Sequence, residues 1–108
     1  MIPGVMKLIK FSDTECGLCH KMSYFDSQVA TSLGIEFEQI FVGSVEFERF
    51  SDFLVSLYDD DKESIGWPSY VLFNVDTGKY VALGIIKGAL PKTEFRKGLL
   101  SFYSTDSE

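Results

Sequence analysis

The pattern of apolar and polar residues predicts four strands. Residues 6–11 read M-K-L-I-K-F, which is typical of a short and largely buried strand. Strict alternation begins at residue 35 and predicts a second strand over 35–42. Residues 69–74 form a third apolar run, and 80–86 a fourth. The turn-like residues 76–78, Asp-Thr-Gly, lie between the last two runs, so we expect an antiparallel hairpin there.

Three further segments carry apolar residues at helical spacing. The first runs over about 16–33 and ends at Gly34, a position suited to positive φ. The second covers about 45–58, and the third covers 91–103 with Pro91 near its first position. Three polar residues before the first helix can each cap it: Ser12, Asp13 and Thr14.

The order β-α-β-α-β-β-α predicts an α/β fold with a four-stranded mixed sheet flanked by helices. The 108 residues have room for one core, so we interpret 1–108 as a single domain with a core over 6–103 and a polar tail over 104–108. Hydrophobic residues make up 45 % of the chain and aromatic residues 15 %, which is enough to fold without a disulfide or metal staple.

Charge and hydropathy argue against several function classes. The net charge is −6 and no basic run exceeds two residues, so we expect no nucleic-acid partner. No apolar run approaches the roughly 18–20 residues that span a bilayer, so we expect no membrane partner. The first residues lack a secretory pattern, which favours a cytoplasmic location. In a reducing compartment, two cysteines separated by two residues indicate redox chemistry or metal binding.

The motif Cys16-Gly17-Leu18-Cys19 falls where the first strand passes into the first helix. Unpaired N–H groups at a helix N-terminus stabilise an anion, so Cys16 is predicted to have a lowered thiol pKa and to act as the nucleophile. The negative charge of the adjacent Glu15 is expected to raise the thiol pKa of Cys16 and so to oppose this effect. Cys19 follows one helical turn later, is expected to be more buried, and is close enough to resolve a mixed disulfide.

Two other interpretations of the cysteines remain. A structural zinc ion needs four ligands, and only His20 is left as a further soft or borderline ligand, so we predict no metal site. The cysteines could also be two buried, inert thiols. His20 is interpreted as an exposed helical residue, although its position four residues after Cys16 would also allow it to modulate the thiolate weakly.

The segment Gly66-Trp67-Pro68 opens the third strand, where the missing N–H of proline is tolerated. Together with the CGLC motif after the first strand, and with the Gly-Ala-Leu segment at 88–90 before the last amphipathic helix, this order resembles the thioredoxin superfamily. The resemblance covers about residues 6–103.

The resemblance implies a thiol–disulfide oxidoreductase that acts on protein disulfides as a monomer. Its only redox group would be the Cys16–Cys19 disulfide, without a separate cofactor, and a reductase or glutathione would supply electrons. Pro68 would be a cis-proline that faces the dithiol, and Gly66 and Trp67 would border the substrate. The Trp67 side chain is interpreted either as a core aromatic or as a surface aromatic beside Cys16.

The chain departs from the family in its length and at one charged position. It is a minimal, glutaredoxin-length version without an extra strand and helix before the CGLC motif. Lys10 stands where thioredoxins place a buried aspartate, so we expect Lys10 to tune the dithiol, with Glu38 or Gln39 as its partner. Two alternative functions remain: a docking module of thioredoxin fold whose dithiol is incidental, and a glutaredoxin-like enzyme that uses glutathione, although no glutathione-binding segment is recognisable.

Overall fold

A four-stranded sheet forms the centre of the computed structural model, which describes residues 5–58 and 66–103. The strand order is β2-β1-β3-β4. The bounds are Val5–Ser12 for β1, Glu36–Phe41 for β2, Ser69–Asp76 for β3 and Lys79–Lys87 for β4. All four predicted strands are confirmed to within two residues at each end.

The sheet is mixed, as the element order predicted. Strand β1 pairs in parallel with β2 and antiparallel with β3, and β3 pairs antiparallel with β4. Thr77 and Gly78 link β3 to β4 with φ values of 51° and 81°. A two-residue turn with positive φ at both positions matches the twist of a hairpin, which explains the glycine in this turn.

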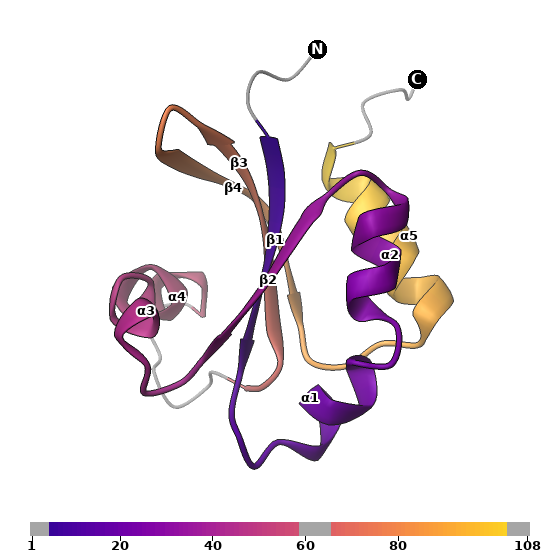
Figure 1. Cartoon of the computed structure of the whole chain (residues 1–108), viewed down its shortest axis with the longest axis horizontal. Helices are drawn as coiled ribbons and strands as arrows, with labels where there is room; N and C mark the ends of the chain where they lie inside the picture. The colour runs from indigo at the N-terminus through magenta and orange to yellow at the C-terminus, as the bar shows by residue number, and fades with distance from the viewer. Residues whose placement is uncertain (1–4, 59–65, 104–108) are drawn as a thin grey trace.

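Helices cover both faces of the sheet (Figure 1). On one side lie α1, α2 and α5, and on the other side lie α3 and α4. Their bounds are Gly17–Met22, Asp26–Ser32, Val45–Glu48, Ser51–Leu57 and Lys92–Tyr103 for α1 to α5 in order. Within the described ranges, no helix is long and apolar enough to cross a membrane. The predicted polar tail, 104–108, lies outside the described residues.

The single helix predicted over 16–33 is wrong, because residues 23–25 separate α1 from α2. Around this break the backbone forms tighter bonds, from the Tyr24 N–H to the Lys21 carbonyl and from the Phe25 N–H to the Met22 carbonyl. Such bonds over three residues end one helical axis and allow a second to begin in a new direction. Gly34 follows α2 with φ of 75°, as predicted.

The helix predicted over 45–58 is also divided, between α3 and α4. The N–H groups of Arg49 and Phe50 bond to the carbonyls three residues earlier, at distances of 3.2 and 3.0 Å. Ser44 caps α3 by accepting the Phe47 N–H. The break places the Phe50 ring against Phe11 in the core, with ring centroids 5.6 Å apart.

Two glycines allow α5 to approach β4 closely. A Cβ atom on Gly84 would overlap the ring of Phe102, and one on Gly98 would lie 3.2 Å from the Ile86 side chain. The cost of a glycine within α5 is therefore offset by close packing of the helix on the sheet.

Candidate active site

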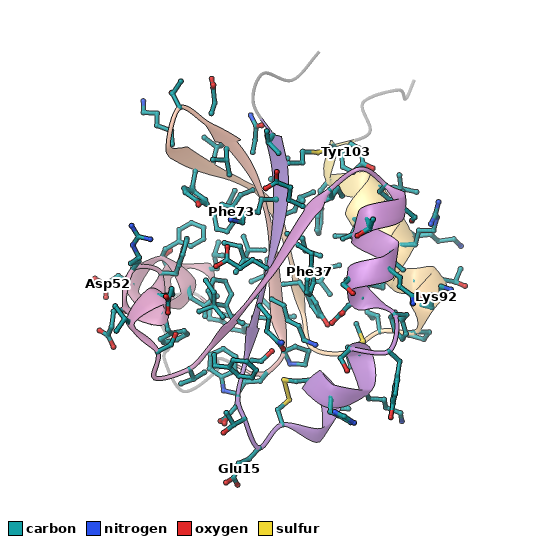
Figure 2. The ribbon with its side chains drawn as sticks, in the orientation of Figure 1. Glu15, Phe37, Asp52, Phe73, Lys92 and Tyr103 are labelled. Atoms are coloured by element: carbon teal, nitrogen blue, oxygen red, sulfur yellow. A yellow bond between two sulfur atoms is a disulfide. The ribbon has the colours of Figure 1, made fainter. Side chains whose placement is uncertain are left out.

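Cys16 and Cys19 form a disulfide at the end of the sheet where β1 passes into α1. Figure 2 shows this sulfur bridge near Glu15, at the opposite end of the molecule from Tyr103. The Cα atoms of the two cysteines are 5.2 Å apart. Cys16 is itself the N-cap of α1, because its Sγ accepts the N–H of Cys19 at 2.9 Å. The prediction that Ser12, Asp13 or Thr14 caps this helix is therefore wrong.

The two cysteines differ in exposure. Cys19 is only 4 % exposed, whereas Cys16 is half-buried. Between them, Gly17 and Leu18 are both exposed, and the Leu18 side chain is 50 % accessible. Cys16 is therefore the more accessible of the two cysteines.

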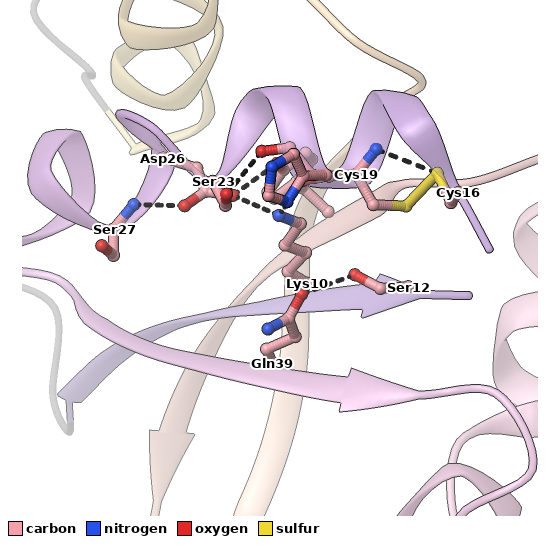
Figure 3. Close-up of polar contacts among 10 residues, drawn as sticks. Lys10, Ser12, Cys16, Cys19, Ser23, Asp26, Ser27 and Gln39 are labelled. Carbon is pink, nitrogen blue, oxygen red and sulfur yellow. Dashed lines mark hydrogen bonds and ion pairs between the residues drawn. A yellow bond between two sulfur atoms is a disulfide. The ribbon is translucent and has the colours of Figure 1, made fainter. Parts of the chain in front are cut away.

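Lys10 lies directly beneath this helix and is 1 % exposed. Its Nζ donates to the Cys19 carbonyl at 2.7 Å and pairs with Asp26 Oδ2 at 2.6 Å (Figure 3). The structure thus places Lys10 against α1, and its effect on the dithiol stays a prediction.

The predicted partners of Lys10 are wrong. Successive side chains of a strand point to opposite faces, so Glu38 lies on the face of the sheet opposite to Lys10. On that face Glu38 pairs with Lys7 at 2.7 Å. Gln39 is level with Lys10 in the parallel register but accepts a hydrogen bond from Ser12 at 2.9 Å. The counter-ion of Lys10 is Asp26, which was not among the predicted partners.

Sequence reasoning did not identify Asp26 as a site residue. Asp26 is 2 % exposed and comes directly after the break between α1 and α2. Its Oδ2 also accepts the hydroxyl of Tyr70 at 2.8 Å, and its Oδ1 accepts the N–H of Ser27 at 2.6 Å. A carboxylate on the inward-facing stripe of a predicted helix was the signal that could have revealed it.

Tyr70 connects this network to β3. Its ring is fully buried, and its centroid lies 4.8 Å from that of Phe95 on α5. Burial raises the pKa of Tyr70, and the hydrogen bond to the Asp26 carboxylate raises it further, because both oppose a phenolate. Tyr70 is therefore held as a neutral donor to Asp26.

The segment Gly66-Trp67-Pro68 precedes β3, and its Trp67–Pro68 peptide bond is cis. Pro68 is buried, and its carbonyl accepts the Gly88 N–H at 2.9 Å. Trp67 is half-buried and meets Phe47 edge to face, with ring centroids 6.0 Å apart. The Trp67 side chain is thus partly buried against Phe47, and the roles of Gly66, Trp67 and Pro68 toward a substrate stay predictions.

A polar pocket of about 240 Å³ opens beside the disulfide. It is lined by both cysteines together with Asp13, Thr14, His20, Ser23, Gln39 and Phe41. His20 is exposed, and its ring contacts Tyr24 at 5.5 Å. Across residues 5–58 and 66–103, no group of three or more histidine, cysteine or acidic side chains is arranged to hold a metal ion.

Comparison with known proteins gives structural matches only. No family model and no curated protein matches the sequence. A thioredoxin from Thermus thermophilus superposes with a TM-score of 0.66 at 19 % identity, over 95 % of this chain and 77 % of that one. Thioredoxin f2 from Chlamydomonas reinhardtii gives 0.65 at 13 %, over 94 % and 82 %. A thioredoxin from Fasciola hepatica gives 0.61 at 20 %, over 93 % and 83 %.

These matches and the sheet order establish the fold class that the sequence predicted. Four strands in mixed pairing, with helices on both faces, carry a Cys-x-x-Cys disulfide at the start of the first helix. The chain therefore has the thioredoxin fold.

Proposed function

We propose that the chain is a thiol–disulfide oxidoreductase that acts on protein disulfides. The observation that carries the proposal is the disulfide between half-buried Cys16 and buried Cys19 at the N-terminus of α1. In this proposal Cys16 is the nucleophile and Cys19 is the resolving thiol.

The reaction begins with the reduced dithiol. The Cys16 thiolate attacks one sulfur of the substrate disulfide, and the other substrate sulfur leaves as a thiolate that takes up a proton. Cys19, having lost its proton, then attacks the sulfur of Cys16 and releases the second substrate thiol. Two electrons have passed to the substrate, and the Cys16–Cys19 disulfide remains. An external reductase or glutathione restores the dithiol.

The surface around the disulfide supports a polypeptide substrate. Leu18 is 50 % exposed and Phe41 is 38 % exposed, and Phe41 lines the pocket that contains both cysteines. A second cavity of about 320 Å³ begins at Leu18, and it is lined further by Lys21, Met22, Phe25, Ala89, Leu90 and Pro91. Exposed apolar side chains next to a reactive sulfur give an extended peptide a place to bind.

Reduction of insulin in the presence of dithiothreitol tests the proposal. We expect the chain to accelerate precipitation of the insulin B chain above the rate with dithiothreitol alone, and Cys16→Ser to abolish the acceleration. A native chain that gives no rate above the reductant would contradict the proposal and favour a docking module. A rate that requires glutathione instead of dithiothreitol would favour the glutaredoxin-like alternative.

A further inference from the structure

Two opposite charges are buried beneath the dithiol. Among the residues that the structure describes, Lys10 and Asp26 are the charged side chains of the interior, at 1 % and 2 % exposure. We propose that Asp26 is a positioning residue that acts through Lys10, and that the balance of these two charges sets the redox potential of the Cys16–Cys19 pair. This inference rests on the proposed function, because it concerns the same dithiol.

The contacts form a chain from Asp26 to the resolving cysteine. Asp26 Oδ2 holds Lys10 Nζ at 2.6 Å, and Nζ in turn donates to the Cys19 carbonyl at 2.7 Å. Tyr70 and the Ser27 N–H fix the carboxylate from its other sides. The ammonium is therefore held against the backbone of the residue that carries the buried sulfur (Figure 3).

Stability alone does not explain this pair. Desolvation of two buried ions usually cancels their mutual attraction, and apolar residues of similar volume often serve a fold equally well. Apart from the Tyr70 hydroxyl that donates to Asp26, the surrounding cluster is hydrophobic and contains Leu8, Val29, Leu72 and Phe95. The pair contacts the backbone of Cys19, so it lies where its charges can act on the dithiol.

The sign of that effect follows from electrostatics. Reduction of the disulfide creates thiols that can ionise, so a nearby cation favours the reduced form and a nearby anion opposes it. The other charged or titratable groups around the site are exposed or half-buried, and solvent weakens their effect: Asp13, Glu15, His20 and Lys21. The two buried charges act on the redox equilibrium in opposite directions, so their effects on the dithiol largely cancel.

Removal of the negative charge should therefore shift the redox equilibrium in one direction, and removal of the positive charge should shift it in the other. Asp26→Asn keeps the shape of the side chain and leaves the Lys10 ammonium unbalanced, so the disulfide becomes easier to reduce. Lys10→Met leaves the Asp26 carboxylate unbalanced, so the disulfide becomes harder to reduce. A merely structural role would weaken the fold in both variants but would not move the potential in opposite directions.

The test is equilibration of the full chain with glutathione redox buffers, with the dithiol fraction read by mass spectrometry after alkylation. For reduction by glutathione, we expect the equilibrium constant to rise about tenfold in Asp26→Asn and to fall about tenfold in Lys10→Met, which corresponds to about 30 mV in each direction. The double variant Lys10→Met/Asp26→Leu should return to within threefold of the native chain.

Asp26→Asn and the double variant still test the inference if Lys10→Met does not fold. Shifts in the same direction for both single variants, or a value for Asp26→Asn within twofold of the native chain, would overturn it. This equilibrium does not depend on turnover of insulin. Opposite shifts in a chain that fails to reduce insulin would therefore contradict the proposed function alone.

Discussion

Lys10 and Phe11 are neighbours on β1, and both are fully buried, yet they point into opposite layers of the molecule. On the α3/α4 face, the Phe11 ring packs edge to face on Phe47 and Phe50. On the α1/α2/α5 face, Lys10 instead forms an ion pair with Asp26 and bonds to the carbonyl of Cys19. One strand thus carries aromatic packing on one side and a buried charge on the other.

The difference separates two tasks within a small domain. The α3/α4 face excludes water mainly with apolar side chains, and its buried polar contact is between two neutral hydroxyl groups, those of Tyr58 and Ser69. The other face places a charge where every contact must be satisfied, because an unpaired buried ion is strongly destabilising. The buried ion pair of Lys10 and Asp26 lies beneath the disulfide, and for this reason we connect it with the redox chemistry of the dithiol.

Loss of one partner of the ion pair is expected to have the largest effect. Lys10→Met should lower the free energy of unfolding by about 3–5 kcal/mol, because Asp26 keeps its charge in the interior without a counter-ion. Urea denaturation of the oxidised chain measures this loss. The matched control, Lys10→Met/Asp26→Leu, should recover most of it. A loss below about 1 kcal/mol in the single variant would mean that the carboxylate does not depend on Lys10.

A cavity on the α3/α4 face should lower the stability of the fold without affecting the redox equilibrium. Leu54 on α4 is fully buried, and Leu54→Ala should cost about 3 kcal/mol. Urea denaturation gives the cost, and glutathione equilibration at a temperature where the variant is folded gives the redox equilibrium. If this variant shifted the equilibrium as far as Asp26→Asn does, the proposed division between the two faces would be wrong.

Tyr70→Phe should have a smaller effect, which depends on pH. Loss of one hydrogen bond to a carboxylate should cost about 1.5 kcal/mol at neutral pH. The pKa of Tyr70 is raised above its ordinary value of 10.0, so the folded chain holds this proton more tightly than the unfolded chain. The associated stability is present below about pH 10 and is lost as the pH rises above it.

Urea denaturation of the native chain and of Tyr70→Phe between about pH 8 and pH 11 measures this dependence. The stability difference between the two chains should shrink at the alkaline end. The other tyrosines are common to both chains, so their titration cancels in the comparison. A difference that stays constant over this range would contradict the role of Tyr70 as a neutral donor.

The fluorescence of Trp67 reports, without any substitution, whether the α3/α4 face extends to the dithiol. Trp67 is the only tryptophan and packs on Phe47, within the aromatic cluster of the α3/α4 face. If the 66–68 segment also borders the dithiol, as the resemblance to thioredoxins implies, the disulfide should quench the indole. Reduction should then raise the emission. Emission that is unchanged on reduction would mean that Trp67 belongs to the α3/α4 face and does not border the dithiol.

The strands and the hairpin could be predicted because their signals are local. Short apolar runs, and strict alternation in the case of β2, identified the strands, and the Asp76-Thr77-Gly78 turn identified the hairpin. The two helix breaks could not be predicted, because apolar spacing continues through both of them. Each break is defined by backbone bonds over three residues that bring Asp26 or Phe50 into the core.

The candidate site was predictable only in part for a similar reason. The spacing of Cys16 and Cys19 and the unusual lysine at position 10 are visible in the sequence. The partner of Lys10 depends on which face of the sheet each side chain occupies and on the direction of α2 after the break. These are tertiary features, so the contacts of Asp26 with Lys10 and Tyr70 could be seen only in the structure.

In the proposed reaction Cys16 attacks the substrate and Cys19 resolves the mixed disulfide. Incubation of Cys19→Ser with a peptide disulfide, followed by mass spectrometry, tests these two roles, with Cys16→Ser as the matched control. We expect a stable mixed disulfide on Cys16 in the first variant, because no second thiol can release the peptide. We expect little adduct in the control, because Cys19 is buried. Equal adduct in both variants, or faster reaction through Cys19, would contradict the proposed roles.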